Sequence, residues 1–312
     1  PWLSRRREAV FPRTRGRNQS VDFMNSPRWL IPAAFLSSLF LITPAAAAGE
    51  DLDADVVVYG DASGGVTAAV QAARMGKSAI LISQYGHLGG LTSSGLGWSD
   101  IGNDAILGGL AREFYHRLYQ HYQRPEAWTH QDRDSFGNQG QGVPALNPKT
   151  ELASTFEPKV AEAVFDTMIE EAGVEVIRGR LDLEKGIVKE GRRITALRLE
   201  DGRKVSGRMF IDASYEGDLM PGAGVSFVTG RESNAEFNEQ GNGNTGVAKK
   251  NQLPKGIDPY VVAGDPDSGL LPGVNPDLGG EKGEGDHRLQ AYCYRMVLTD
   301  VPENRIMIGR PE

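Results

Sequence analysis

Cysteine is almost absent from this chain of 312 residues, since Cys293 is the only one. A single cysteine excludes an intrachain disulfide, a CxxC redox pair, and a zinc or iron-sulfur site built from several cysteines. Any electron transfer by this protein must therefore use a borrowed cofactor. Cys293 itself lies in a segment of alternating aromatic residues, 290–295, which predicts a buried and inert thiol.

Runs of lysine and arginine are missing outside the N-terminal extension, and the formal net charge is -7. This acidic balance argues against nucleic acid as a partner, because binding nucleic acid depends on neutralising its phosphates. Hydrophobic residues make up 39% and charged residues 24% of the chain. Such a composition is typical of a soluble α/β protein with one large or two modest domains.

Residues 1–48 are typical of a processing signal. Met24 is the expected start, with Arg28 supplying positive charge, Leu30–Ile42 an apolar core, and residues 45–48 a small-residue cleavage site. We therefore expect export by a Sec-type route to the periplasm or the medium, and no stable membrane anchor after cleavage.

Two alternatives to this export route stay open. The uncharged stretch 29–48 is just long enough to span a bilayer, although Pro32 and Pro44 weaken it as a permanent anchor. Arg5 and Arg6 resemble a twin-arginine element, but they stand far from the apolar run. Twin-arginine export is accordingly the minor alternative.

The segment 55–82 predicts a βαβ unit. Residues 55–59 form an apolar, β-branched run that ends in glycine, as a buried parallel strand does. The helix that follows has its apolar residues at helical spacing and stops at Gly76, and residues 79–82 form a second buried strand.

Further elements are expected along the rest of the chain. The patterns predict helices over 103–122 and from Pro158 to Gly173, a strand over 174–177, a hairpin over 194–205 with an Asp201-Gly202 turn, and a buried strand over 209–212. We expect residues 123–150 to form a polar surface insertion, and residues after Arg231 to be largely loop-like.

These elements predict an α/β fold: a Rossmann-like domain with a βαβ unit and parallel sheet, a β-hairpin layer, and an incomplete substrate region. The expected boundaries are 1–48 for the extension and signal, 49–230 for the Rossmann-like domain with its insertion at 123–150, and 231–312 for the start of a substrate-binding or capping region. We also expect the chain to continue in nature beyond Glu312, and this piece alone to be inactive.

The motif Gly60–Gly65 stands between the first strand and its helix, where a dinucleotide fingerprint belongs. Gly60 suits a tight turn, the small Ala62 replaces a middle glycine, and Gly65 permits close helix packing. Ser63 and Gly64 complete the helix N-terminus, which would face a pyrophosphate. The alternative is a glycine-rich turn with a structural role.

Ser83 and Gln84 follow the second strand, at the place where an acidic residue usually holds the ribose hydroxyls. Both side chains are able to hydrogen-bond a diol. The absence of a carboxylate at this position argues more strongly against NAD than against FAD. Binding of NAD depends on that carboxylate, whereas FAD makes many other contacts. An ordinary strand-end role for Ser83 is an equal alternative.

Three spaced segments together resemble a known family: Gly60–Gly65, then 87–98 with its His-Leu-Gly-Gly turn, and 210–218 with Phe-Ile-Asp-Ala-Ser. They are similar to the FAD-dependent oxidoreductases of the glutathione-reductase-like fold. Residues 156–165 and 230–233 are closer to the bacterial subgroup related to xanthan lyase. The resemblance covers about residues 55–312.

The resemblance implies that the Rossmann-like domain, 49–230, is an FAD-binding domain, and it implies further FAD contacts. It places the turn from His87 to Gly90 against the pyrophosphate and flavin side, the backbone of one strand residue at adenine, and the 212–213 segment near FAD. The residues so implied are His87, Gly89, Gly90, Val176, Asp212 and Ala213. Without the resemblance, His87 is a surface turn residue and 212–218 an acidic loop.

No catalytic residue is evident in the sequence. Arg112, Arg231 and Arg295 are weak candidates for holding an anionic substrate or steadying reduced flavin, and a structural or solvated role is the favoured alternative for each. No cluster suggests a metal site, since Glu216 and Asp218 have no His or Cys near them. The leading hypothesis is an FAD enzyme that transfers hydride or electrons from a small substrate, possibly a sugar derivative, to an unknown electron acceptor. The alternatives are a non-catalytic binding protein on the same fold and an NAD-dependent dehydrogenase.

Overall fold

The computed structural model describes residues 51–136, 142–246, 256–276, 280–289 and 295–310. The chain divides into residues 1–46 and 47–312, and every element below belongs to the second unit. The expected export signal and Cys293 lie outside the described residues.

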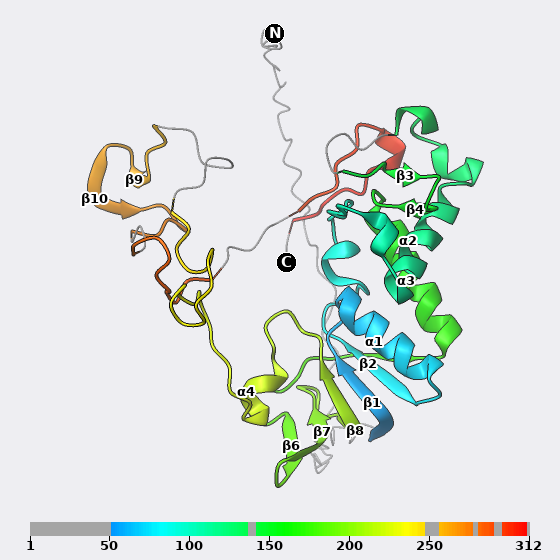
Figure 1. Cartoon of the computed structure of the whole chain (residues 1–312), viewed down its shortest axis with the longest axis horizontal. Coiled ribbons are helices and arrows are strands. Elements are labelled where there is room, and N and C mark those ends of the chain that lie inside the picture. The colour runs from blue at the N-terminus through cyan, green and yellow to red at the C-terminus, as the bar shows by residue number, and fades with distance from the viewer. Residues whose placement is uncertain (1–50, 137–141, 247–255, 277–279, 290–294, 311–312) are drawn as a thin grey trace, which may run out of the picture. The chain divides into compact units, whose positions relative to one another are not determined.

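The main sheet of this unit has six strands in the order β5-β2-β1-β8-β7-β6 (Figure 1). Its strands are β1 (Leu52–Tyr59), β2 (Ala79–Ser83), β5 (Glu175–Arg178), β6 (Ile187–Glu190), β7 (Arg193–Arg198) and β8 (Lys204–Asp212). The first four in this order run parallel, while β7 and β6 are antiparallel to their neighbours. The predicted α/β fold with a parallel βαβ unit is confirmed, and the predicted hairpin extends the same sheet.

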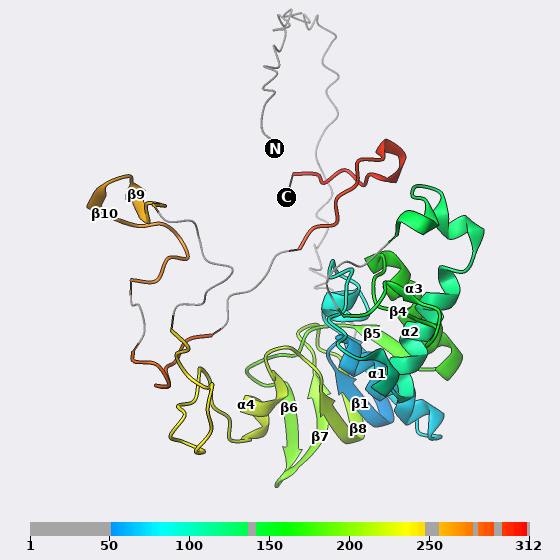
Figure 2. The same ribbon diagram turned by 45° about the horizontal axis from the view of Figure 1, so that its top comes forward.

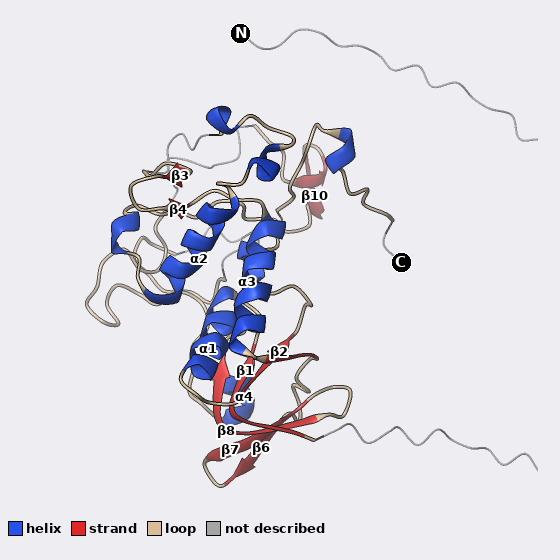
Figure 3. Cartoon of the chain, turned by 90° about the vertical axis from the view of Figure 1, so that its right-hand side faces the viewer, coloured by secondary structure: helices blue, strands red, loops and turns tan. Residues whose placement is uncertain are grey.

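Three helices contact one another beside this sheet (Figure 3): α1 (Ser63–Arg74), α2 (Gly109–His121) and α3 (Pro158–Ala172). Pro158 starts α3 at a position where the lost N–H has no helical partner in any case. Gly173 ends α3 in the left-handed conformation, with φ 66°. The short helix α4 (Leu219–Ala223) contacts β6 instead (Figure 2).

Side chains alternate across the central strands and form two separate cores. Val58 and Leu81 belong to the cluster that includes the apolar faces of α1, α2 and α3. Val57 and Ile80 belong to a second cluster with Leu181 and residues of β7 and β8. Because both faces are covered where β1 and β2 pair, residues 56–59 and 79–82 form nearly continuous apolar runs.

The predicted helix over 103–122 is wrong at its start. Residues Asp104–Ile106 form a separate 3-10 turn, in which the Asn103 side chain accepts a hydrogen bond from the Ala105 N–H. Leu107 is extended, Gly109 has φ 54°, and α2 begins there. Two successive glycines interrupt the helical backbone, so Ile106 falls outside it and is 79% exposed.

The two strand segments predicted at 203–205 and 209–212 are one strand, β8. It pairs in parallel with β1 and antiparallel with β7, across the expected Asp201-Gly202 turn. The prediction that 209–212 is buried is wrong, because Met209 is 65% exposed and the other three residues are half-buried. The sequence patterns also failed to indicate β6, which has only two apolar residues.

Irregular segments contain several short elements. A 3-10 turn at Gly90–Thr92 precedes the expected insertion. In and directly after the insertion are 3-10 turns at Pro125–Trp128 and Arg133–Ser135, and the pair β3 (Leu146–Asn147) with β4 (Leu152–Ala153). The insertion is partly internal, because Trp128 and Phe136 stack around the buried Tyr122. After Arg231 the described chain has β9 (Tyr260–Val262) paired with β10 (Asp265–Leu270) and a 3-10 turn at Pro302–Asn304, and is otherwise loop-like, as predicted.

Candidate FAD-binding site

The candidate site is the edge of the sheet at the carboxyl ends of β1, β2 and β8. Gly60 follows β1 with φ 112°, and its N–H donates to the carbonyl of Ile82 at 3.0 Å. A Cβ on Gly60 would stand 2.4 Å from the carbonyl carbon of Ala213. The missing side chain thus lets the segment after β8 lie directly against the loop after β1.

The N-terminus of α1 follows within this loop. Its first helical hydrogen bond runs from Val66 N–H to the Ala62 carbonyl at 3.0 Å, and no side chain caps the preceding N–H groups. Gly64 is exposed, and a Cβ there would meet nothing within 4 Å. With no acidic residue in the first turn, this end of the helix suits an anion such as a pyrophosphate.

Gly65 has a different role from Gly64. A Cβ on Gly65 would lie 2.0 Å from the Gly60 carbonyl oxygen and 3.1 Å from the Ala213 Cβ. Glycine at this position therefore closes the loop onto itself and onto the segment after β8. Gly65 shapes the anion site by protein packing, independently of any ligand.

The turn at Gly89 and Gly90 joins the same edge. Gly89 has φ 106° and donates its N–H to the Asp61 carbonyl at 2.7 Å. A Cβ on Gly89 would stand 2.4 Å from the Phe165 ring, and one on Gly90 2.4 Å from the Tyr215 hydroxyl. Both glycines combine a left-handed backbone with a close contact to another segment, so the three segments predicted to bind FAD do meet here.

Asp212 and Ala213 anchor the end of β8. The Ala213 N–H donates to the Tyr59 carbonyl at 2.7 Å. The Asp212 carboxylate accepts hydrogen bonds from Ser214 Oγ at 2.6 Å and from Leu219 N–H at 2.8 Å. The carboxylate therefore holds the turn between β8 and α4, which keeps Ala213 beside Gly60.

Ser83 and Gln84, the expected diol ligands, are both engaged by the protein. Ser83 is 1% exposed and donates its hydroxyl to Asp61 Oδ2 at 2.7 Å. The Gln84 amide donates to the Tyr59 hydroxyl at 2.6 Å and to Asp218 Oδ2 at 2.9 Å. Burial raises the pKa of Tyr59, whose hydroxyl also accepts the Leu181 N–H at 3.0 Å.

His87 and Val176, two further residues that the resemblance implies, have different surroundings. The imidazole of His87 is largely exposed, and its Nδ1 is 2.8 Å from Glu162 Oε1 on α3. Val176 pairs with Leu81 in β5, an edge strand of the described sheet. The free edge of β5 leaves its backbone groups available to a ligand.

The three candidate arginines are not gathered at this edge. Arg112 donates to the Thr150 carbonyl at 3.0 Å, and Arg231 forms a two-pronged ion pair with Asp286. The Arg231 guanidinium holds the pKa of Asp286 down at about 2. Arg295 is exposed, and its backbone lies near Gly95. The first two arginines thus have structural partners.

Asp61 is the site residue that the sequence reasoning missed. It is 2% exposed, and its carboxylate accepts from both Ser83 and the Tyr85 N–H. The sequence did contain a signal that could have identified Asp61. A charged residue stands between Gly60 and Ala62, in a loop that is usually uncharged in dinucleotide-binding proteins. Tyr215 was also missed, and its hydroxyl accepts the Leu91 N–H at 2.8 Å.

The described segments contain neither a cluster of metal ligands nor a helix suited to a membrane. No group of three or more His, Cys, Asp or Glu side chains among these residues is placed to hold a metal ion. None of the described helices combines the length and the apolar character needed to cross a membrane.

Solved structures with a similar arrangement are distant. One is L-amino acid deaminase from Proteus vulgaris, with 15% identity over 59% of this chain and 54% of that chain, and a TM-score of 0.37. Another is L-proline dehydrogenase from P.horikoshii, with 15% identity over 59% of each chain and a TM-score of 0.38. A third is the flavin-containing monooxygenase from Stenotrophomonas maltophilia, with 16% identity over 52% of this chain and 38% of that chain, and a TM-score of 0.32. This chain spans 38% to 59% of the length of these proteins, and at such TM-scores the likeness carries no functional argument.

No curated protein matches the sequence. A family model described as FAD dependent oxidoreductase does match, over residues 55–312. That span includes the loop after β1, the turn at Gly89 and Gly90, and the segment after β8. These parts fit FAD, because they assemble an uncapped helix N-terminus and a glycine-lined edge at the carboxyl ends of parallel strands. This chain belongs to the FAD dependent oxidoreductase family.

Proposed function

We propose that this chain binds FAD at the described sheet edge and forms the FAD-binding part of an exported oxidoreductase. One observation carries the proposal: three segments distant in sequence meet at the uncapped N-terminus of α1. Dinucleotide-binding folds hold their ligand at this kind of edge, outside the carboxyl ends of the strands.

Individual residues have distinct parts in holding FAD. The N–H groups of Ser63 and Gly64 would bind the pyrophosphate, since they lack helical partners and lie at the positive end of α1. The turn at Gly89 and Gly90 would lie beside the pyrophosphate and flavin, and the backbone of Val176 at adenine. Bound FAD supplies the capacity to accept a hydride or single electrons.

The chain's own contribution to chemistry is to bind and orient. We assign no catalytic residue, because Arg112 and Arg231 are committed to Thr150 and Asp286. The similarity of residues 156–165 and 230–233 to the xanthan-lyase-related subgroup supports placing the protein there. A small sugar derivative is therefore the first substrate class to test, together with hydroxy acids.

The test of FAD binding is the flavin absorbance of the purified protein. We expect a yellow wild-type protein and a colourless Gly65→Val variant, because the added side chain would displace the Gly60 carbonyl. Gly102→Val is the matched control, since a Cβ there meets nothing within 4 Å and φ lies outside the left-handed region. A wild-type protein that is colourless and cannot be reconstituted with FAD would refute the proposal.

A further inference from the structure

The end of β2 lacks the acidic residue that dinucleotide-binding folds usually carry there to bind a ribose hydroxyl. Ser83 occupies the position and does not replace the acid directly. Its hydroxyl donates to Asp61 at 2.7 Å, accepts the Gly86 N–H at 3.1 Å, and is buried. Both roles of the Ser83 hydroxyl are thus used within the protein.

A carboxylate nevertheless stands at the end of β2, contributed by the loop after β1. Asp61 Oδ2 lies 2.7 Å from Ser83 Oγ and 2.9 Å from the Tyr85 N–H. The Asp61 carbonyl accepts the Gly89 N–H at 2.7 Å, which fixes the backbone of the same residue. The carboxylate is therefore held on the β2 side of β1, away from β8 in the strand order.

The second carboxylate oxygen, Oδ1 of Asp61, accepts no hydrogen bond from any residue that the structure describes. A buried carboxylate is costly unless hydrogen-bond donors surround it. The adjacent N-terminus of α1 favours the negative charge, but its N–H groups do not hydrogen-bond Oδ1. A ligand hydroxyl would be a suitable further donor.

We propose that Asp61 accepts a hydrogen bond from the adenosine ribose of FAD, in place of the acid usually found at the end of the second strand. This inference rests on the proposed function. Ser83 and the Tyr85 N–H then act as positioning groups that hold the carboxylate. The side of the sheet agrees, because β2 and β5 carry the proposed adenosine contacts and β8 lies on the other side of β1.

The first test needs only the wild-type protein, stripped of FAD and titrated with ADP, 2′-deoxy-ADP and 3′-deoxy-ADP by calorimetry. Loss of the hydroxyl that meets the carboxylate should weaken binding about tenfold to a hundredfold, as expected for a hydrogen bond to a charged group. If ADP and both deoxy analogues bind equally, the assignment of Asp61 is wrong while FAD binding stands. If the protein binds neither FAD nor ADP, the proposed function itself fails.

Variants then assign the effect to Asp61. Asp61→Asn should bind ADP and the deoxy analogues with nearly equal affinity, and Glu126→Gln, an exposed acid on a 3-10 turn, is the control. The double variant D61A/S83E moves the carboxylate to the strand end and should restore the preference for ADP. A folded Asp61→Asn that still discriminates, or a folded double variant that does not, would overturn the inference.

Discussion

Gly60 adopts a backbone conformation that side chains rarely tolerate, and it is also packed against another segment. Its φ is 112°, and a Cβ would stand 2.4 Å from the Ala213 backbone. Gly202, in the turn between β7 and β8, has φ 90° but would meet nothing within 4 Å. A substitution at Gly202 therefore measures the cost of the backbone conformation alone, whereas one at Gly60 adds the cost of a steric clash.

We predict that Gly60→Ala destabilises the fold more than Gly202→Ala. A non-glycine residue in such a conformation costs roughly 1–3 kcal/mol, and only Gly60→Ala adds a clash with backbone atoms. Urea denaturation of both variants measures the difference, and FAD retention should fall for Gly60→Ala alone. Equal midpoints would show that Ala213 moves aside without cost.

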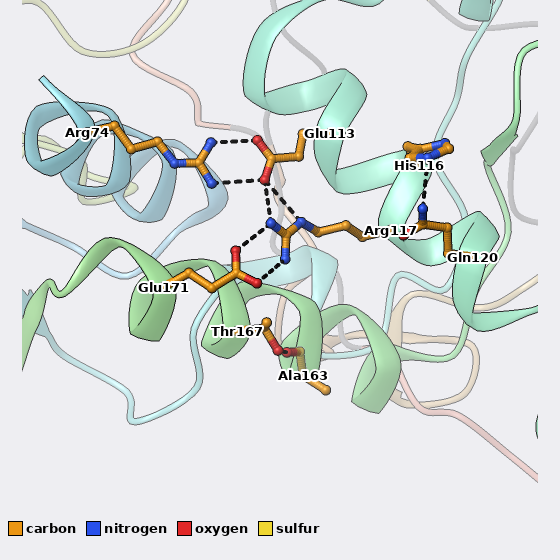
Figure 4. A network of polar contacts seen from close by, with 8 residues as sticks. All are labelled: Arg74, Glu113, His116, Arg117, Gln120, Ala163, Thr167 and Glu171. Atoms are coloured by element: carbon orange, nitrogen blue, oxygen red, sulfur yellow. Dashed lines mark hydrogen bonds and ion pairs between the residues drawn. The ribbon is translucent and has the colours of Figure 1, made fainter.

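The three helices of the larger core are joined by a charged network (Figure 4). Glu113 on α2 lies 2.5 Å from Arg74 on α1 and 2.7 Å from Arg117, which in turn is 2.5 Å from Glu171 on α3. Hydrogen bonds, first from Arg74 and then from Arg117, lower the pKa of Glu113 from 4.5 to about 2, although burial opposes them. The network thus connects elements separated in sequence by up to 97 residues, from Arg74 to Glu171.

This network predicts a loss of stability in acid. Because the folded-state pKa of Glu113 is depressed, its contribution is present above pH 4.5 and disappears as the pH falls toward 2. We expect Glu113→Gln to lower the unfolding free energy by about 1 kcal/mol at neutral pH, a modest figure because the group is partly solvent-screened. The unfolding free energy of the variant should also change less between pH 5 and pH 2 than that of the wild-type protein.

Urea denaturation across that pH range checks the prediction for α1, α2 and α3. Glu126→Gln is the control, because its exposed carboxylate has no ion pair with a described residue. A wild-type curve that parallels the Glu113→Gln curve throughout would contradict the proposed contribution.

At the scale of the whole molecule, cofactor choice is the main question. We predict that FAD raises the midpoint of thermal unfolding more than FMN, because FMN lacks the adenosine half that β2 and β5 would contact. A ligand at a hundredfold excess over its Kd stabilises by about 2.7 kcal/mol. Stabilisation by NAD without any by FAD would favour a nicotinamide-dependent dehydrogenase instead.

Export is a second property of the whole molecule. We predict that the exported protein begins close to Gly49, after cleavage that follows the small residues 45–48. Mass spectrometry of protein recovered from the periplasm or the medium would locate this terminus. Recovery of the protein only from the cytoplasm, with Arg5 to Arg17 intact, would contradict the prediction.

Local patterns in the sequence were sufficient for the βαβ unit, for α3, and for the turn at Asp201-Gly202. Their signals lie within one element: β-branched runs, helical spacing, Pro158 at a helix start, and glycine at the ends. The position of Gly60–Gly65 between strand and helix also follows from local order. The place of the candidate dinucleotide site was therefore predictable in outline.

Tertiary structure alone decided which side chains meet at that site. Asp61 and Ser83 are 22 residues apart, and Gly90 and Tyr215 are 125 apart, so no periodicity links them. The sheet order β5-β2-β1-β8 brings these segments to one edge, and only there does the Asp61 carboxylate reach the end of β2. Sequence spacing indicated that the strand end lacked its acid, whereas folding placed another carboxylate beside it.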